Sequence, residues 1–186
     1  PYEQPDRLVA LYDALPTLGY PRTGLSEAEF VRLRRENRSF EELAGWYWWE
    51  RVSLRGVSEP ESVAAPFCTA NFFRTLGVKV AFGREFNVGE EVEGKNLVVV
   101  LSHAFWQRKF AGDPAIFGRT LDLDGVGYTV IGALPASFKA PMELRADTNA
   151  DLWRVSDLRT SNPRRGGQYL GVIGRLRPDI TLPQAQ

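Results

Sequence analysis

The stretch of sequence that decides the fold covers residues 96–134 and reads NLVVVLSHAFWQRKFAGDPAIFGRTLDLDGVGYTVIGAL. Near its start, the unbroken and largely β-branched run LVVVL at 97–101 predicts a buried strand. Ser102 comes directly after this run and is a favoured N-cap, so residues 103–110 are expected to form a helix. Trp106 and Phe110 lie one turn apart in that helix, and Trp106 is expected to be a core ring.

The same stretch ends in a predicted hairpin. Two alternating segments are joined at Asp124 and Gly125, the dipeptide that a type I′ turn favours. Further along, ADLWRV (150–155) and QYLGVIGRL (168–176) are typical of short strands, and Thr181 begins a last helix. Strands and helices are therefore mixed along the chain, which predicts the α+β class.

Segments before this stretch predict further helices. Ser26 and Glu29 form a capping box for a helix with acidic residues in its first turn and arginines in its last. Ser39 and Glu42 repeat the box and predict a second short helix through Leu43, closed by Gly45. TANFFRTLGV (69–78) is expected to be a helix capped by Thr69 and ended by Gly77, whereas DRLVALYDAL (6–15) is compatible with strand or helix.

The stretch GWYWWERVSL (45–54) is unusual because it places four aromatic rings side by side. As a strand, it would turn one face toward the core, made of Trp46, Trp48, Val52 and Leu54. Its other face carries Tyr47, Trp49, Arg51 and Ser53, two rings beside a guanidinium, and is expected to be less buried. Three uses of Tyr47, Trp49 and Arg51 stay open: packing against another lobe, contact with a partner, or binding of a small ligand such as a sugar.

Composition narrows the function classes. The 186 residues carry 23 basic and 23 acidic side chains, so the net charge gives no support for nucleic-acid binding. One cysteine excludes an intramolecular disulfide, a zinc ribbon and a redox pair. No stretch approaches the roughly 18 apolar residues that span a bilayer. The abrupt opening PYEQPDRLVALY and the ending TLPQAQ are typical of a fragment, so targeting signals cannot be judged.

No residues are predicted to be catalytic, to bind a cofactor or to hold a metal. His103 is the single histidine, and its place after a helix cap indicates a structural contact. Cys68 lies in the apolar segment APFCTANFF and is expected to be a buried small hydrophobe. The acids of GEEVEG (89–94) sit among glycines and are expected to form a solvated turn, and Asp124 is explained by the hairpin. The sequence does not match a phosphate-binding loop, because Gly94 and Lys95 lack the leading glycine of that motif and the Ser or Thr that should follow the lysine.

Several segments resemble one family in order and spacing. LSEAEFVRLRRENRSFEELAGW, the stretch 96–138, ADLW and GGQYLGVIGRLRPDITLPQAQ are similar to the periplasmic core domain of MacB-type, FtsX-like ABC transporter permeases, above all the duplicated permeases of acidobacteria. The aromatic stretch departs from that pattern, being richer in rings. The resemblance implies a two-lobed extracytoplasmic domain. Residues 1–45 and 164–186 would form a porter-like α/β lobe, incomplete here, and residues 46–163 an inserted, mostly β lobe called Sabre.

The function that the resemblance implies is mechanical. A cytoplasmic ABC ATPase would move the permease's own transmembrane helices, and the periplasmic domain of this membrane-embedded, inner-membrane protein would relay that motion to substrates or partners in export or efflux. MacB itself works with a periplasmic adaptor protein and an outer-membrane channel, which need not apply here. The family brings no catalytic residues, no cofactor and no nucleic-acid partner. The alternative is an extracytoplasmic ligand- or carbohydrate-binding module that uses Tyr47, Trp49 and Arg51; an enzyme is a more distant third.

Overall fold

The computed structural model describes residues 2–15, 19–47, 51–57, 59–141, 150–157 and 167–185. The helices are α1 (Glu27–Glu36), α2 (Phe72–Leu76), α3 (His103–Phe110) and α4 (Leu182–Ala185), with 3-10 turns η1 (Pro5–Arg7), η3 (Val88–Glu90) and η4 (Pro114–Ile116). The strands are β1 (Leu8–Leu11), β2 (Asp13–Leu15), β3 (Tyr20–Thr23), β4 (Phe40–Tyr47), β5 (Arg51–Arg55), β6 (Glu61–Ala64), β7 (Phe67–Cys68), β8 (Phe82–Gly83), β9 (Val98–Leu101), β10 (Thr120–Leu123), β11 (Val126–Ala133), β12 (Leu152–Val155) and β13 (Gly171–Leu176).

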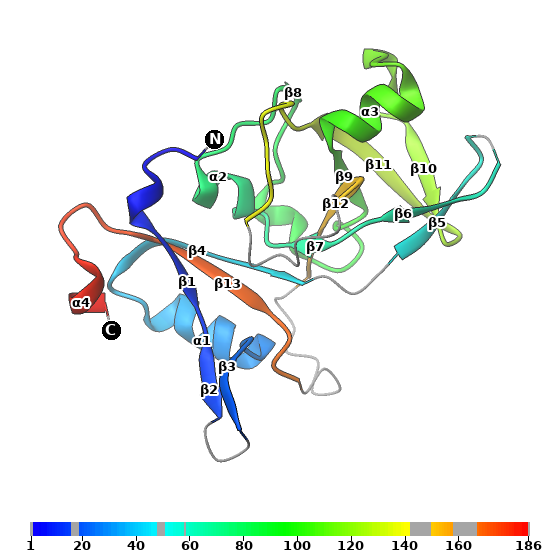
Figure 1. Ribbon diagram of the computed structural model, residues 1–186. Helices are drawn as coiled ribbons and strands as arrows, with labels where there is room; N and C mark the ends of the chain where they lie inside the picture. The colour runs from blue at the N-terminus through cyan, green and yellow to red at the C-terminus, as the bar shows by residue number, and fades with distance from the viewer. Residues whose placement is uncertain are drawn as a thin grey trace.

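One large mixed sheet organises the described residues. Its strands lie in the order β1-β13-β4-β7-β12-β9-β11-β10-β5-β6, and β8 pairs with β11. Most neighbours are antiparallel, while β9 with β11 and β7 with β12 run parallel. Figure 1 shows α1 beside β1, β13 and β4, and α3 at the far end of the molecule. The α+β class predicted from the sequence is confirmed.

The described residues pack into three apolar clusters along this sheet. The α1 core is made of Leu25, Phe30, Phe40, Leu43, Tyr47, Leu170, Val172 and Leu176. The central core includes Ala44, Trp46, Cys68, Phe72, Phe73, Leu76, Phe86, Val100, Trp153, Val155 and Ile173. The barrel core includes Val52, Leu54, Val63, Val99, Leu101, Phe105, Trp106, Leu121, Leu123, Tyr128, Val130 and Leu152.

The sheet curls back on itself around the barrel core. β6 ends at Ala64 and leads through Ala65 and Pro66 directly into β7, which lies beside β12. At the seam, the Asp151 amide donates to the Ala64 carbonyl and the Ala64 amide donates to Asp151 Oδ2, each at 2.9 Å. Because this contact joins the last strand of the path to the region of β12, we call this part the barrel end. The part around α1, β1, β13 and β4 is the α1 end.

Most local predictions are confirmed. The Ser26 hydroxyl accepts from the Glu29 amide and Glu29 returns the bond, which begins α1 at Glu27. Ser102 caps α3 with a single bond, in which its hydroxyl accepts from the Phe105 amide. Asp124 and Gly125 have φ values of 54° and 85°, as the two central residues of a type I′ turn require.

The predicted short helix that Ser39 would cap, running through Leu43 and closed by Gly45, is wrong, because residues 40–45 belong to strand β4. Asn37 ends α1 and redirects the chain: its Oδ1 accepts from the amides of Ser39 and Phe40. Glu42 does not return a capping bond, since its carboxylate accepts from Asn71 and Arg74. Burial between β13 and β7 therefore overrides the local capping pattern.

The predicted N-cap of α2 is also wrong. The helix begins at Phe72 with Asn71 as its N-cap, and Thr69 Oγ1 instead accepts from the Gly45 amide at 3.1 Å. The hydroxyl therefore ties the start of α2 to β4. The predicted end of α2 at Gly77 is confirmed, with φ of 69° in the left-handed region.

Candidate functional site

The aromatic stretch lies at the junction between the α1 end and the barrel end. β4 continues to Tyr47 and β5 begins at Arg51, so Trp48 and Trp49 lie outside the described residues. Trp46 is 6% exposed and Tyr47 8% exposed, on opposite faces of the sheet. Tyr47 is slightly more exposed than Trp46, in the expected order, but both side chains are buried because a second core covers the face that carries Tyr47. In β5 the predicted alternation holds, with Val52 and Leu54 buried.

Tyr47 and Arg51 contact different parts of the molecule. The Tyr47 ring stacks on Phe67 with centroids 4.9 Å apart and meets the edge of Tyr169 at 5.6 Å. Arg51 is exposed and donates to the hydroxyl and the carbonyl of Ser62 on the neighbouring strand β6, at 3.0 and 2.7 Å. Use of Tyr47, Trp49 and Arg51 as one binding face stays a prediction.

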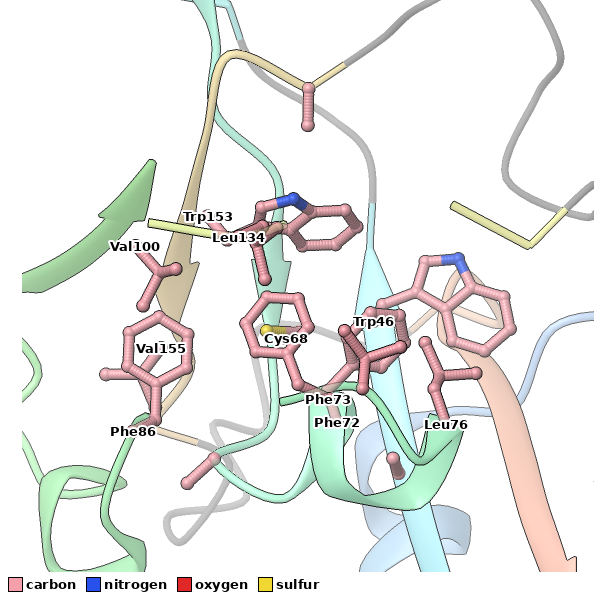
Figure 2. Close-up of a cluster of buried hydrophobic side chains, with 14 of the residues drawn as sticks. Trp46, Cys68, Phe72, Phe73, Leu76, Phe86, Val100, Leu134, Trp153 and Val155 are labelled. Atoms are coloured by element: carbon pink, nitrogen blue, oxygen red, sulfur yellow. The ribbon is translucent and has the colours of Figure 1, made fainter. Parts of the chain in front are cut away.

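The central core joins the two ends from the other face of the sheet (Figure 2). Trp46 of β4 lies 5.8 Å from Phe72 of α2, measured between ring centroids. Phe72 in turn stacks on Trp153 of β12 at 5.1 Å, and Phe73 meets the edge of Trp153 at 5.7 Å. These rings come from both sides of the junction, so neither end buries its apolar surface alone.

Strand β13 makes room for these rings with glycine. Gly171 pairs with Trp46, and a Cβ on Gly171 would lie 2.5 Å from the indole ring. Gly174 lies under the Phe40 ring in the same way. Any larger residue at either position would overlap an aromatic ring, so both glycines are required by close approach.

Glu91 is a buried charge at the junction that the sequence did not reveal. It is 3% exposed; one carboxylate oxygen pairs with Arg34 Nη1 at 3.1 Å and the other accepts from the Ala70 amide at 2.8 Å. The prediction of a solvated turn is therefore wrong for Glu91. Its partners are distant in sequence, so the local GEEVEG pattern could not identify it. By contrast, Asn87 and Glu90 form a capping box that their spacing would have indicated.

The candidate reactive groups lie in separate places. Cys68 is in the central core, and burial raises the pKa of its thiol well above the ordinary value, with the Glu91 charge acting in the same direction. His103 begins α3 and packs edge-on against Trp106 at 6.1 Å. Within the described ranges, no group of three or more His, Cys, Asp or Glu side chains is arranged to hold a metal.

Several carboxylates at the barrel end have structural partners. Asp151 accepts from Arg108 Nη2 at 2.9 Å as well as from Ala64, and Arg108 also binds Glu61 at 2.6 Å. Asp124 accepts from the Ser53 amide at 2.9 Å. These bonds fasten the seam and the edge of the barrel end rather than line a cleft.

An open groove of about 510 Å³ runs beside the second half of α1. Tyr12, Arg32, Arg38, Phe40 and Ala185 are among its lining residues. Two of its acids are occupied, since Glu29 binds Ser26 and Asp13 binds Gln168. The groove offers charged and apolar contacts but brings together no nucleophile and base.

Comparison with solved structures supports the fold. The periplasmic region of MacB from Actinobacillus actinomycetemcomitans is similar with a TM-score of 0.69 and 15% identity, over 96% of this chain and 78% of that one. A domain of a putative permease from Porphyromonas gingivalis gives 0.68 and 15%, over 97% and 80% of the two chains. The extracellular domain of the noncanonic ABC-type transporter YknZ from Gram-positive bacteria gives 0.64 and 12%, over 92% and 84%.

A search of curated proteins finds no match. None of the helices in the described ranges has the length and apolar character needed to cross a membrane. The family model described as the MacB-like periplasmic core domain matches residues 3–186. The resemblance seen in the sequence is thereby confirmed, and the chain belongs to the family of MacB-like periplasmic core domains of ABC transporter permeases.

Proposed function

We propose that this domain relays ATP-driven movement of the permease's transmembrane helices to substrates or partner proteins and performs no chemistry itself. As a MacB-like periplasmic core domain it is the extracytoplasmic part of an ABC-type permease, a class that works with transmembrane helices and an ATPase. The relay, the division into a porter-like lobe (1–45 and 164–186) and an inserted lobe (46–163), and any adaptor protein are parts of the proposal. The proposed boundary after residue 45 falls within β4.

The observation that carries the proposal is the continuity of the fold across the junction. One sheet runs from β1 at the α1 end to β6 at the barrel end, and the central core draws residues from both sides. Close-packed protein interiors have low compressibility, so a displacement applied at one end is passed on rather than absorbed. This is the property that a mechanical relay needs.

The chemistry of the candidate reactive groups also supports a non-catalytic role. A thiol is a nucleophile only as the thiolate, and burial of Cys68 disfavours that form. His103 packs against an aromatic ring at the start of α3. The buried carboxylate of Glu91 is occupied by Arg34 and Ala70.

The proposal is tested in the full-length permease with its ATPase by substituting Glu91→Gln. This change keeps the shape of the side chain but removes the charge that holds Arg34, so we expect transport to fall several-fold while ATP hydrolysis continues. Glu90→Gln is the matched control, because Glu90 lies in the same loop and binds the exposed Arg84 instead of an arginine of α1. Unchanged transport in both Glu91→Gln and Glu91→Lys would contradict the relay.

The ligand-binding alternative is separated by titration. A carbohydrate bound at Trp49 and Arg51 would shift or quench tryptophan fluorescence in a saturable way, whereas a mechanical domain is expected to give no change on addition of glycans. A saturable change that is abolished by Trp49→Ala would favour the binding module over the relay.

A further inference from the structure

A row of side chains crosses the junction on the face of the sheet opposite the central core. It begins at the first turn of α1 and passes over β4 and β7 to β12. In the sheet, Phe67 of β7 pairs with Tyr47 of β4 on one side and with Arg154 of β12 on the other, which places the three side chains on one face. We call the row the junction stack; its members are Glu27, Tyr169, Tyr47, Phe67 and Arg154.

Each neighbouring pair in the junction stack is in direct contact. The Arg154 guanidinium carbon lies 3.7 Å from the centroid of the Phe67 ring, and Phe67 stacks on Tyr47 at 4.9 Å with planes 20° apart. Tyr47 meets the edge of Tyr169 at 5.6 Å. The Tyr169 hydroxyl donates to the carboxylate of Glu27 in the first turn of α1.

Arg154 anchors the stack to the barrel end. Its side chain is buried, with the residue 5% exposed, and Nε donates to the Ala65 carbonyl at 3.0 Å. The guanidinium also lies 6.0 Å from the Tyr128 ring of the barrel core. A cation held over an aromatic face is attracted more strongly when water is excluded, so this contact is well suited to fix Phe67 in place.

The sheet has few paired residues where the junction stack crosses it. β7 has two residues and makes two residue pairs with β4 and two with β12. β13 and β4, by comparison, pair over six positions. Bending at β7 is therefore opposed mainly by side chains, with the central core on one face and the junction stack on the other.

We infer that the junction stack couples the α1 end to the barrel end, with Phe67 as the positioning residue at its centre. This inference rests on the proposed relay function, because it names the contacts through which movement would pass. It predicts that a substitution at Phe67 or Arg154 speeds amide hydrogen exchange at Leu25 and Leu170. These two residues exchange backbone hydrogen bonds of 2.9 and 3.0 Å beside the other end of the stack.

The test is amide hydrogen exchange in the 186-residue chain with Phe67→Leu, which keeps an apolar side chain but removes the ring. After correction for the change in global unfolding measured by urea melts, we expect exchange at Leu25 and Leu170 to rise about tenfold. Arg154→Met is the second variant and is expected to act in the same direction. A stack that does not couple the ends would show faster exchange only near β7, at Arg154, whose amide donates to the Pro66 carbonyl, and at Ser156, whose amide donates to the Cys68 carbonyl.

Arg175→Met is the matched control. Arg175 is also a buried arginine, at 7% exposed, but it donates to the carbonyl oxygens of Thr75 and Glu3. It lies on β13, about 17 Å along the strand from Leu170, whereas Arg154 lies about 14 Å from Leu170 across three strand spacings, so the two arginines are at comparable distances in the sheet. If distance alone decided the effect, Arg175→Met would speed exchange at Leu25 and Leu170 as much as Arg154→Met does, and that result would overturn the inference.

A double-mutant cycle gives an independent readout. Tyr47→Leu and Arg154→Met alter side chains on opposite sides of Phe67, and with Phe67 present we expect their effects on the unfolding equilibrium constant to depart from additivity by about threefold or more. With Leu at position 67 they should be additive; additivity in both backgrounds would refute the coupling. These measurements need no ATPase. The coupling through the junction stack can therefore be refuted even if transport still depends on Glu91, so failure of this inference and failure of the proposed relay give different results.

Discussion

The two ends of the molecule use similar strands but treat the edges of the sheet differently. At the barrel end the last strand of the path, β6, leads back to the region of β12, and Ala64 and Asp151 close this seam with two hydrogen bonds. At the α1 end the described path stops at β1, whose four residues are all half-buried. Unpaired strand edges and half-buried side chains are where proteins open first. The difference teaches that the two ends of one continuous sheet can differ in how firmly their strands are held.

The largest expected effect is the loss of stability when a core ring is truncated, and it should differ between the two ends. Trp106→Ala in the barrel core should lower the free energy of unfolding by about 3–5 kcal/mol, because a buried ring is replaced by a cavity that the closed sheet cannot collapse into. Phe30→Ala in the α1 core should cost about 3 kcal/mol, at the lower end of the same range, because α1 can move inward. Urea melts measure both. A larger loss for Phe30→Ala would break the comparison.

The helix caps offer a smaller and more local contrast. Ser102→Ala and Ser26→Ala each remove an oxygen that accepts from a first-turn amide, so each should destabilise by about 1 kcal/mol. We expect exchange of the α1 amides to respond more than exchange of the α3 amides, since α1 covers the less complete core. Equal local responses, measured by hydrogen exchange, would show that the two ends do not differ in this respect.

Alkaline pH acts on the core between the two ends. The pKa of Cys68 is raised in the folded state by burial, so its contribution is fully present below the thiol's unfolded pKa and is lost as pH rises through the folded one. Stability should therefore decline above about pH 8.5. In Cys68→Ala this part of the decline should be absent in urea melts between pH 7 and 10. Because the thiol lies in the central core, both ends should weaken together.

The smallest expected effect is a loss of stability at acid pH, which arises at the barrel end. Hydrogen bonds from Lys109 and Arg108 lower the pKa of Glu61, so its contribution is present above the unfolded pKa and is lost as pH falls through the folded one. Melts from pH 5 to pH 3 should show a shallower decline in Glu61→Gln. The network is partly exposed, so 1 M salt should weaken the difference. A difference that salt leaves unchanged would indicate a buried pair.

Features decided by neighbouring residues were predictable from the sequence. The capping box of Ser26 and Glu29, the Ser102 cap and the Asp124–Gly125 turn all depend on residues within a few positions of each other. The family resemblance predicted more of the overall fold than the local sequence patterns did.

Features decided by distant partners were not predictable. Ser39 and Glu42 have the spacing of a helix start, but β13 and β7 flank this segment and draw it into the sheet. Tyr47 has the alternation of an exposed face, yet Phe67 and Tyr169 cover it. The two-residue alternation of a strand shows which side chains share a face, but it does not show whether other parts of the chain cover both faces.

The close fit between Trp46 and Gly171 has an evolutionary consequence. Since an indole on β4 occupies the space of a side chain on β13, the two positions cannot drift independently. In relatives that carry a bulkier residue in place of this glycine, the tryptophan should have shrunk, and a search for such compensating pairs would trace how the junction has been rebuilt during divergence.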